Sequence, residues 1–202
     1  MTASLFDDHR PQTDGIVPLG TGAAVLRGFA HAQGEGLVAL VRDIAATAPF
    51  RHLVTPGGHT MSVAMTNCGS LGWISDPRGY RYSAVDPLTG EPWPAMPEAF
   101  MTLARDAAAE LGFHDFVPDA CLFNPYALVA RLSMPQYLNE RRDTQPILSV
   151  SPGAPAMFRF GGPVVDVKPL ECPLFRGYVV VWGCPSRLDY PGPAPFNDAA
   201  HL

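Results

Sequence analysis

Hydrophobic residues recur with helical spacing in two segments of the chain. Between Gln33 and Ala48 they return every three or four positions, which predicts an amphipathic helix that Pro49 stops. A second segment, from Pro97 to Leu111, repeats this spacing. It opens on a proline suited to a first helical turn, and Gly112 closes it. We therefore expect two helices, both in the first part of the chain.

Short apolar segments bounded by Gly or Pro predict strands. Ala23–Leu26 is one, and Met61–Thr66 is another, lying between the turns Pro56-Gly57-Gly58 and Asn67-Cys68-Gly69. After Pro118 the predicted strands are Ala120–Tyr126, Ile147–Ser151, Ala156–Phe160, Val164–Val167 and Tyr178–Trp182. This spacing is typical of an antiparallel sandwich or jelly roll. The predicted fold class is α+β, with the two helices buttressing one sheet.

The organisation along the chain is that of one compact domain in three parts. Residues 1–20 show little periodicity and are expected to form an irregular N-terminal extension. Residues 21–117 hold both helices and the aromatic, turn-rich stretch Trp73–Trp93. Residues 118–202 hold most of the predicted strands.

Composition narrows the class of protein. The chain has 202 residues, 47% of them hydrophobic, which is enough for a sizeable core. No apolar run reaches membrane-span length, and MTASLFDDHR at the start lacks the basic and apolar stretches of a secretory signal. We expect a cytoplasmic monomer. The net charge of -5 argues against broad nucleic-acid binding but leaves room for a local basic groove.

The cysteines do not indicate a zinc site. Cys68, Cys121, Cys172 and Cys184 are widely spaced and form no CxxC pair. We interpret them as buried, reduced thiols of the core.

Six motifs carry a resemblance to a known family. They occur in order between about residues 20 and 192: TPGGHTMSVAMTNCGSLGW (55–73), GYRYS (79–83), EPWPAMPEAF (91–100), PDACLFNPY (118–126), FRFGG (158–162) and VVVWGCPSRLDY (179–190). Together they resemble the AlkB family of nucleic-acid dealkylating dioxygenases. The resemblance implies a double-stranded β-helix that holds Fe(II) and 2-oxoglutarate and oxidises alkyl groups on damaged DNA or RNA bases.

The chain departs from the family at the iron ligands. A facial triad of two histidines and a carboxylate holds such iron, the first two ligands arriving as His-x-Asp. At the matching positions this chain has Pro135 and Tyr137, and Pro191 stands at the third. Neither His-x-Asp nor His-x-Glu occurs anywhere in the sequence. We therefore predict no metal ligands, no catalytic residues and no bound cofactor in this chain.

Other family positions also differ. The sequence ends at Leu202, before the family's last strand with its two arginines, so we expect that strand to be absent. Asn139 replaces a residue that is usually acidic, and Pro163 follows the Phe-Gly-Gly turn where a basic residue is usual.

The resemblance also assigns binding residues. Trp73, Tyr80 and Tyr82 match lid aromatics that stack on a flipped base, and Met65 would sit under that base. Packing within the protein is the alternative for each. Asn124 and Tyr126 match the Asn-x-Tyr pair that contacts 2-oxoglutarate; their spacing places them on one strand face, where they could equally form a buried hydrogen-bonded pair.

Three hypotheses therefore stay open. The chain is an active AlkB-like dioxygenase, a non-catalytic binder of single-stranded or alkylated nucleic acid, or a degenerate product without function.

Overall fold

The computed structural model describes residues 15–125, 145–153, 155–161, 169–186 and 191–194. For residues 191–194 only the backbone is described. The two helices are α1 (Gly34–Thr47) and α2 (Glu98–Ala109). The strands are β1 (Gly15–Gly20), β2 (Ala23–Arg27), β3 (Arg51–Val54), β4 (Thr60–Gly69), β5 (Gly72–Asp76), β6 (Gly79–Ser83), β7 (Ala120–Phe123), β8 (Ile147–Ser151), β9 (Ala156–Phe160), β10 (Leu170–Leu174), β11 (Tyr178–Trp182) and β12 (Pro191–Ala194).

Both predicted helices are confirmed to within about two residues. Pro97 is the residue before α2, and Gly112 lies just beyond its end with a φ of +86°, which glycine adopts at no steric cost. Leu37 of α1 and Leu103 and Ala107 of α2 are buried, so the apolar stripe that predicted each helix is the face that packs.

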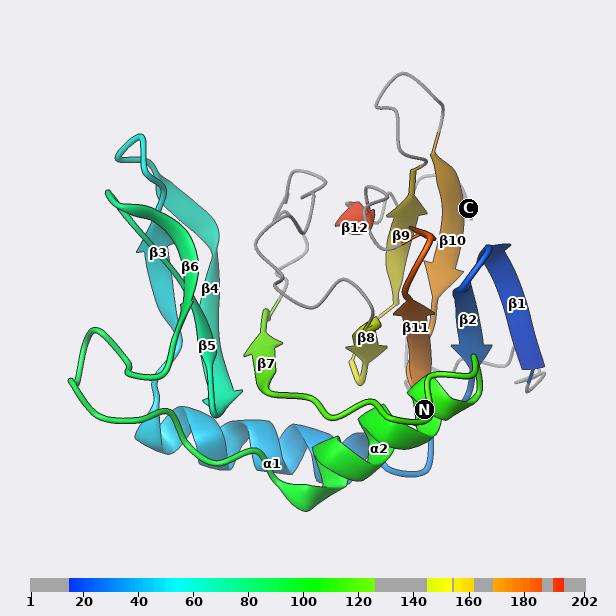
Figure 1. The fold of residues 1–202 in the computed structure, drawn as a ribbon. Coiled ribbons are helices and arrows are strands. Elements are labelled where there is room, and N and C mark those ends of the chain that lie inside the picture. Colours follow the sequence, from blue (N-terminus) through cyan, green and yellow to red (C-terminus); the bar gives the residue numbers. More distant parts are fainter. Residues whose placement is uncertain (1–14, 126–144, 154, 162–168, 187–190, 195–202) are drawn as a thin grey trace, which may run out of the picture.

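The centre of the fold is an antiparallel sheet in the order β1-β2-β11-β8. A second antiparallel sheet, in the order β10-β9-β12, lies beside it (Figure 1). The five residues of β11 are all buried, which explains why its sequence, YVVVW, is apolar without alternation.

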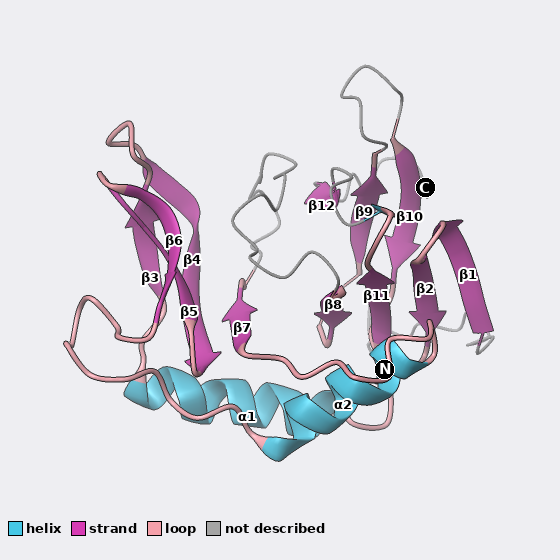
Figure 2. Cartoon of the chain, in the orientation of Figure 1, coloured by secondary structure: helices cyan, strands magenta, loops and turns pink. Residues whose placement is uncertain are grey.

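Strand β11 is buried because it packs on both faces. Tyr178, Val180 and Trp182 face a cluster that includes Phe158 and Phe160 of β9. The other face belongs to a cluster of Val179 and Val181 with residues of both helices and β2, namely Leu37, Leu103, Ala107 and Leu26. The helices therefore buttress the central sheet, as Figure 2 shows, and the predicted α+β jelly roll is confirmed.

The remaining strands form a separate group, which we call the lid. Strands β3, β4 and β7 make one antiparallel sheet, and β5 and β6 make a hairpin. Figure 1 shows β3 to β6 standing together at the left, above α1 and away from β9, β10 and β11. The lid contacts the helix layer at two places: β4 meets α1, and Phe123 of β7 packs on Phe100 of α2.

Several sequence predictions need correction. The Asn67-Cys68-Gly69 turn is wrong, because β4 continues through these residues and pairs with β7, Cys68 lying opposite Cys121. The irregular arm is wrong for residues 15–20, which form β1 against β2. Strands β3, β5, β6, β10 and β12 were not predicted. Val164–Val167 lies outside the described residues.

The cysteine prediction holds only in part. All four are thiols, but only Cys68 is buried, and Cys184 is exposed. Cys121 is half-buried; a hydrogen bond with the Cys68 thiol, and then its partial removal from water, raise the pKa of Cys121 well above its usual range. No described helix is long and apolar enough to cross a membrane.

The packing of β11 leads to a stability prediction. Val180→Ala removes two methyl groups from a fully buried site and should lower the free energy of unfolding by roughly 2 kcal/mol. The matched control is Ile16→Ala on the edge strand β1, where the side chain is 51% exposed and the loss should be within about 0.5 kcal/mol. Urea denaturation measures both; equal losses would contradict the packing described.

Candidate functional site

The β5–β6 hairpin carries three of the aromatic residues singled out in the sequence. In its register Trp73 lies opposite Tyr82, and Ser75 lies opposite Tyr80. The rings of Trp73 and Tyr80 stack, with centroids 5.5 Å apart and planes 12° from parallel. The Tyr80 side chain is 42% exposed, and Trp73 and Tyr82 are half-buried. We call the stacked rings of Trp73 and Tyr80 the aromatic platform.

The alternation of side chains along β5 explains why the platform faces outward. Ile74 is 3% exposed and packs with Ala48 and Trp93 in a small core of the lid. Because neighbouring residues of a strand point to opposite faces, Trp73 projects away from that core. Gly72 lets the strand approach this closely, since a Cβ there would lie 2.3 Å from the Trp93 ring.

The side chain of Asn67 holds the backbone of Trp73. Its Nδ2 donates to the Trp73 carbonyl at 3.1 Å, and its Oδ1 accepts from the Trp73 N–H at 3.0 Å. Asn67 lies on β4 and is 3% exposed. These two bonds join the hairpin to the β3-β4-β7 sheet as a neighbouring strand would.

Two further side-chain bonds attach the hairpin to its surroundings. Ser75 Oγ donates to the Val54 carbonyl of β3 at 2.7 Å. Trp93 Nε1 donates to the Ser83 carbonyl at the end of β6 at 2.9 Å. Among the described residues, β6 is the only strand that pairs with β5, so these contacts fix where the platform lies.

An ion pair joins β3 to the loop that follows β6. Arg51 of β3 binds the Asp86 carboxylate through both terminal nitrogens, at 3.0 and 2.6 Å. The same guanidinium lies over the Trp93 ring, 5.2 Å from its centroid. The Asp86 side chain is only 3% exposed, and that of Arg51 is 18% exposed. Arg51 therefore connects β3 to the loop that carries Trp93.

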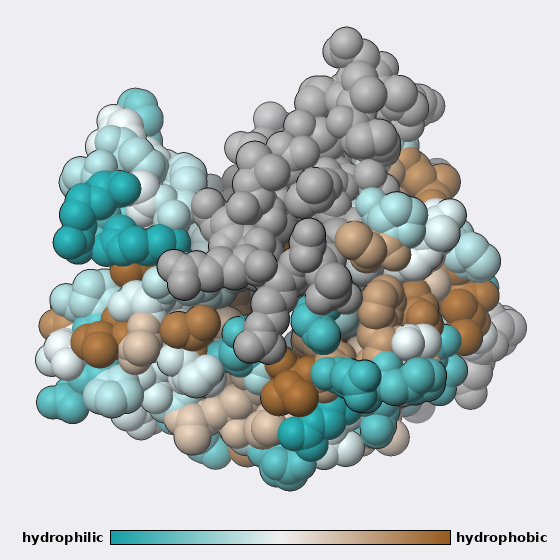
Figure 3. Space-filling view, viewed as in Figure 1, coloured by the Kyte–Doolittle hydropathy of each residue, from teal (hydrophilic) through white to brown (hydrophobic). Residues whose placement is uncertain are grey.

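The tip of the hairpin is charged. Asp76 binds Arg81 at 2.6 and 2.8 Å and Arg78 at 3.0 Å, and it accepts the Arg78 N–H. Hydrogen bonds from Arg81, and then from Arg78, hold the pKa of the Asp76 carboxyl well below its usual range. Figure 3 shows that the exposed surface of this lobe, at the upper left, is mostly hydrophilic. The two arginines and one aspartate leave a single excess positive charge here.

Met65 is less accessible to a ligand than the residues of the aromatic platform. It lies on β4 opposite Arg51, and its side chain is 4% exposed. Its neighbour Thr66 is also buried and donates to the Ala48 carbonyl at 2.6 Å. Both residues are packed in this structure, and a role for Met65 under a base stays a prediction.

Asn124 follows β7 directly. Its Oδ1 atom is buried and accepts no hydrogen bond from the described residues, which is uncommon for a buried polar atom. A ligand or a water molecule that donates a hydrogen bond would satisfy this oxygen. Tyr126, its predicted partner, lies outside the described residues. The structure therefore places only the first member of the Asn-x-Tyr pair.

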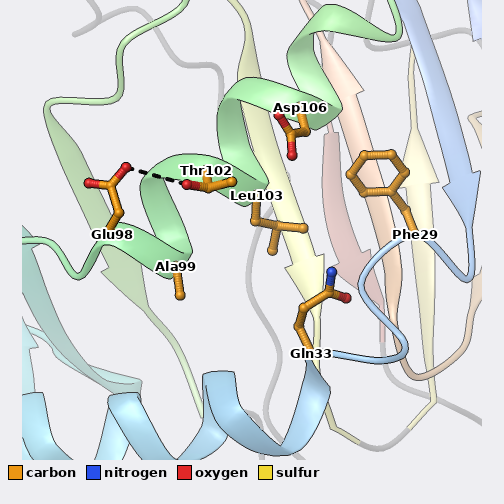
Figure 4. A pocket seen from close by; sticks show the side chains of 7 residues that line it. All are labelled: Phe29, Gln33, Glu98, Ala99, Thr102, Leu103 and Asp106. Carbon is orange, nitrogen blue, oxygen red and sulfur yellow. Dashed lines mark hydrogen bonds between the residues drawn. The ribbon is translucent and has the colours of Figure 1, made fainter.

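A cleft in the described residues lies elsewhere. It has a volume of about 330 Å³ between α2 and the loop that precedes α1, lined by Phe29, Gln33, Glu98, Ala99, Thr102, Leu103 and Asp106. Figure 4 shows Glu98 bonded to Thr102 of its own helix, with Asp106 and Gln33 at the rim. None of the sequence-predicted site residues lines this cleft.

The comparisons with known proteins show the family of the chain and agree with its fold. The family model described as "2OG-Fe(II) oxygenase superfamily" matches residues 22–201. The chain is 49% identical over 197 residues to the Alpha-ketoglutarate-dependent dioxygenase AlkB of Escherichia coli strain K12, covering 98% of this chain and 90% of the relative. The chain belongs to the AlkB family.

Further relatives support this assignment. The AlkB dioxygenase of Salmonella typhimurium is 48% identical, again over 98% of this chain and 90% of the relative. The solved structure of OsALKBH1 superimposes with a TM-score of 0.77, covering 91% of this chain and 88% of that one; at 24% identity, this likeness shows the fold.

The AlkB family uses Fe(II) and 2-oxoglutarate, so the donor atoms of this chain are compared with the needs of each group. At the positions that the family resemblance assigns to the iron ligands, Pro135, Tyr137 and Pro191 offer a single phenol oxygen, because proline has no side-chain donor. Residues 135 and 137 lie outside the described part. Within the described part, no three His, Cys, Asp or Glu residues form a group that could hold a metal. This donor set does not fit iron. The orphaned Asn124 Oδ1 fits a ligand that donates a hydrogen bond, whereas the carboxylate and ketone oxygens of 2-oxoglutarate only accept.

Sequence reasoning missed the supports of this AlkB-family lid. Asn67 was assigned to a turn. The signal for a longer strand was the alternation of apolar residues in Met61–Thr66, which continues through Asn67 to Cys68. The Arg51–Asp86 pair spans 35 positions and leaves no local sequence signal.

The Arg51–Asp86 pair can be tested through stability. Arg51→Met leaves a buried carboxylate without its partner and should lower the free energy of unfolding by about 2–4 kcal/mol. The matched control is Arg159→Met, whose pair with Glu171 is 43% and 46% exposed and should contribute less than about 1 kcal/mol. Chemical denaturation of both variants tests this; a loss with Arg51→Met no larger than the control's would contradict it.

The hairpin tip should respond to acid. The pKa of Asp76 is lowered in the folded state, so its ion pairs stabilise the hairpin above the unfolded pKa of about 3.9, and this stabilisation is lost as the pH falls towards the lower folded pKa. The difference in unfolding free energy between wild type and Asp76→Asn should be constant from pH 7 to 5 and shrink below about pH 4. A difference that grows on acidification would contradict this assignment.

Proposed function

We propose that this AlkB-family protein binds an unpaired, alkylated base of single-stranded nucleic acid on its lid and does not oxidise it. The observation that carries the proposal is the aromatic platform. Trp73 and Tyr80 are stacked, partly exposed and fixed to a packed sheet through Asn67.

Stacking does not depend on iron. An extruded base needs an aromatic face, and each such contact contributes roughly 1–3 kcal/mol whatever the base. Tyr80 covers one face of the Trp73 ring, so a base would stack on the other face or enter between the two rings. Tyr82 lies opposite Trp73 in the hairpin and is proposed as a flanking contact.

The absence of turnover is proposed from donor chemistry. An iron site of this class needs three side-chain ligands on one face, and Pro135 and Pro191 supply none. Without bound iron no oxidant can form from oxygen. We therefore assign neither a catalytic residue nor a metal ligand to this chain.

Binding is expected to be weak and dependent on salt. Phosphate contacts provide most of the affinity in non-specific nucleic-acid complexes, and the protein has a net charge of -5. The cations nearest the platform are partly neutralised, since Arg78 and Arg81 bind Asp76 and Arg51 binds Asp86. Stacking must therefore supply a large share of the binding free energy.

A second candidate is the family's oxidative activity. It is favoured by the 49% identity to the Escherichia coli enzyme over 98% of this chain. Anaerobic addition of Fe(II) and 2-oxoglutarate separates the candidates, because a chelated cosubstrate produces a charge-transfer absorption. We expect no such band and no iron-dependent succinate; either one would overturn the proposed lack of activity.

The binding proposal has its own test. Trp73→Ala should weaken binding of a methylated single-stranded oligonucleotide at low salt by about 1–3 kcal/mol, measured by fluorescence anisotropy. Leu88→Ala is the matched control, because Leu88 is an exposed apolar residue in the loop after β6, outside the platform, and its loss should not change binding. Equal binding by wild type and Trp73→Ala, or no binding by wild type, would refute the proposal and leave the chain without an assigned role.

A further inference from the structure

We infer that Asn67 is a positioning residue that sets the orientation of Trp73 for stacking. The inference rests on the proposed function for its ligand, but its structural part can be tested without any ligand. The observations behind it concern the outer edge of β5, which is the edge that does not face β6.

The outer edge of β5 would otherwise lack partners. The N–H and C=O of one strand residue point to the same side, and both groups of Trp73 bind Asn67 rather than β6. Among the described residues no third strand continues the β5–β6 sheet at this edge. Asn67 thus supplies one donor and one acceptor where a third strand would supply a peptide group.

The geometry makes Asn67 well suited to orient the ring. It is 3% exposed and lies within β4, flanked by the paired residues Thr66 and Cys68, so its side chain has little freedom. Two bonds to one residue fix both the position and the direction of the Trp73 peptide groups. The ring then stands on a backbone that is attached to a packed sheet.

The other attachments of the hairpin do not bind Trp73. Ser75 holds β5 two residues further along, and Trp93 holds the end of β6 at Ser83. Loss of Asn67 should therefore free Trp73 locally while the hairpin stays attached. This separates a positioning role from a general contribution to stability.

The ligand-free test compares Asn67→Leu with Thr66→Val. Both remove buried side-chain hydrogen bonds from adjacent residues of β4, but Thr66 binds the Ala48 carbonyl and not Trp73. In Asn67→Leu the Trp73 amide should exchange with solvent at least about tenfold faster, and the Trp73 indole signal, identified with Trp73→Phe, should shift. Thr66→Val should leave both unchanged. Asn67→Ser serves the same purpose if the leucine variant does not fold. Unchanged exchange at Trp73, or equal effects of Thr66→Val, would overturn the inference.

A double-mutant cycle tests the link to binding. Trp73→Ala should weaken binding of a methylated single-stranded oligonucleotide roughly 5- to 150-fold. Asn67→Leu should weaken it severalfold in the wild-type background and less than twofold in the Trp73→Ala background, because it acts through Trp73. Additive losses would overturn the inference. If the wild-type protein binds no oligonucleotide, the proposed function fails, and amide exchange alone decides the role of Asn67.

Discussion

The lid depends on side-chain hydrogen bonds that replace a strand ladder. Strands β3, β4 and β7 hold one another through backbone pairing, but the β5–β6 hairpin joins them through Asn67 and Ser75. Buried amide and hydroxyl groups are costly when unsatisfied, so these bonds are specific as well as attractive. Because Asn67 holds the backbone of Trp73, a residue fixed from outside the hairpin is also one that presents an aromatic face.

The jelly roll is held together differently. Strand β11 is apolar on both faces because one side packs on β9 and the other on the helices. Among the described residues, the two core clusters of the jelly roll include none from the lid strands. The lid meets the helix layer instead, where β4 contacts α1 and Phe123 of β7 packs on Phe100 of α2. A chain can therefore lose chemistry in the jelly roll while the lid keeps its geometry. That separation is the physical basis for proposing binding without turnover.

The sequence patterns predicted the helices and strands whose formation depends mainly on residues close to them in the chain. The two helices, β8, β9 and β11 follow from apolar spacing between Gly and Pro, and the fold family followed from the motifs. Strands β5 and β6 were not predicted, because the stretch Trp73–Trp93 is rich in turn residues. The hairpin also depends on contacts with Trp93 and Asn67, which lie outside it. The stacking of Trp73 on Tyr80 and the Arg51–Asp86 pair are tertiary contacts that no spacing rule contains. For Tyr126, Pro135 and Tyr137 the sequence is the only source, since they lie outside the described residues.

The central claim is that recognition by the lid is independent of metal chemistry. The most direct measurement is the affinity for a methylated single-stranded oligonucleotide, first with EDTA and then with Fe(II), 2-oxoglutarate and oxygen, followed by mass analysis of the oligonucleotide. The account predicts the same dissociation constant under both conditions and an oligonucleotide of unchanged mass. Tighter binding with iron and cosubstrate, together with loss of the methyl group, would contradict it.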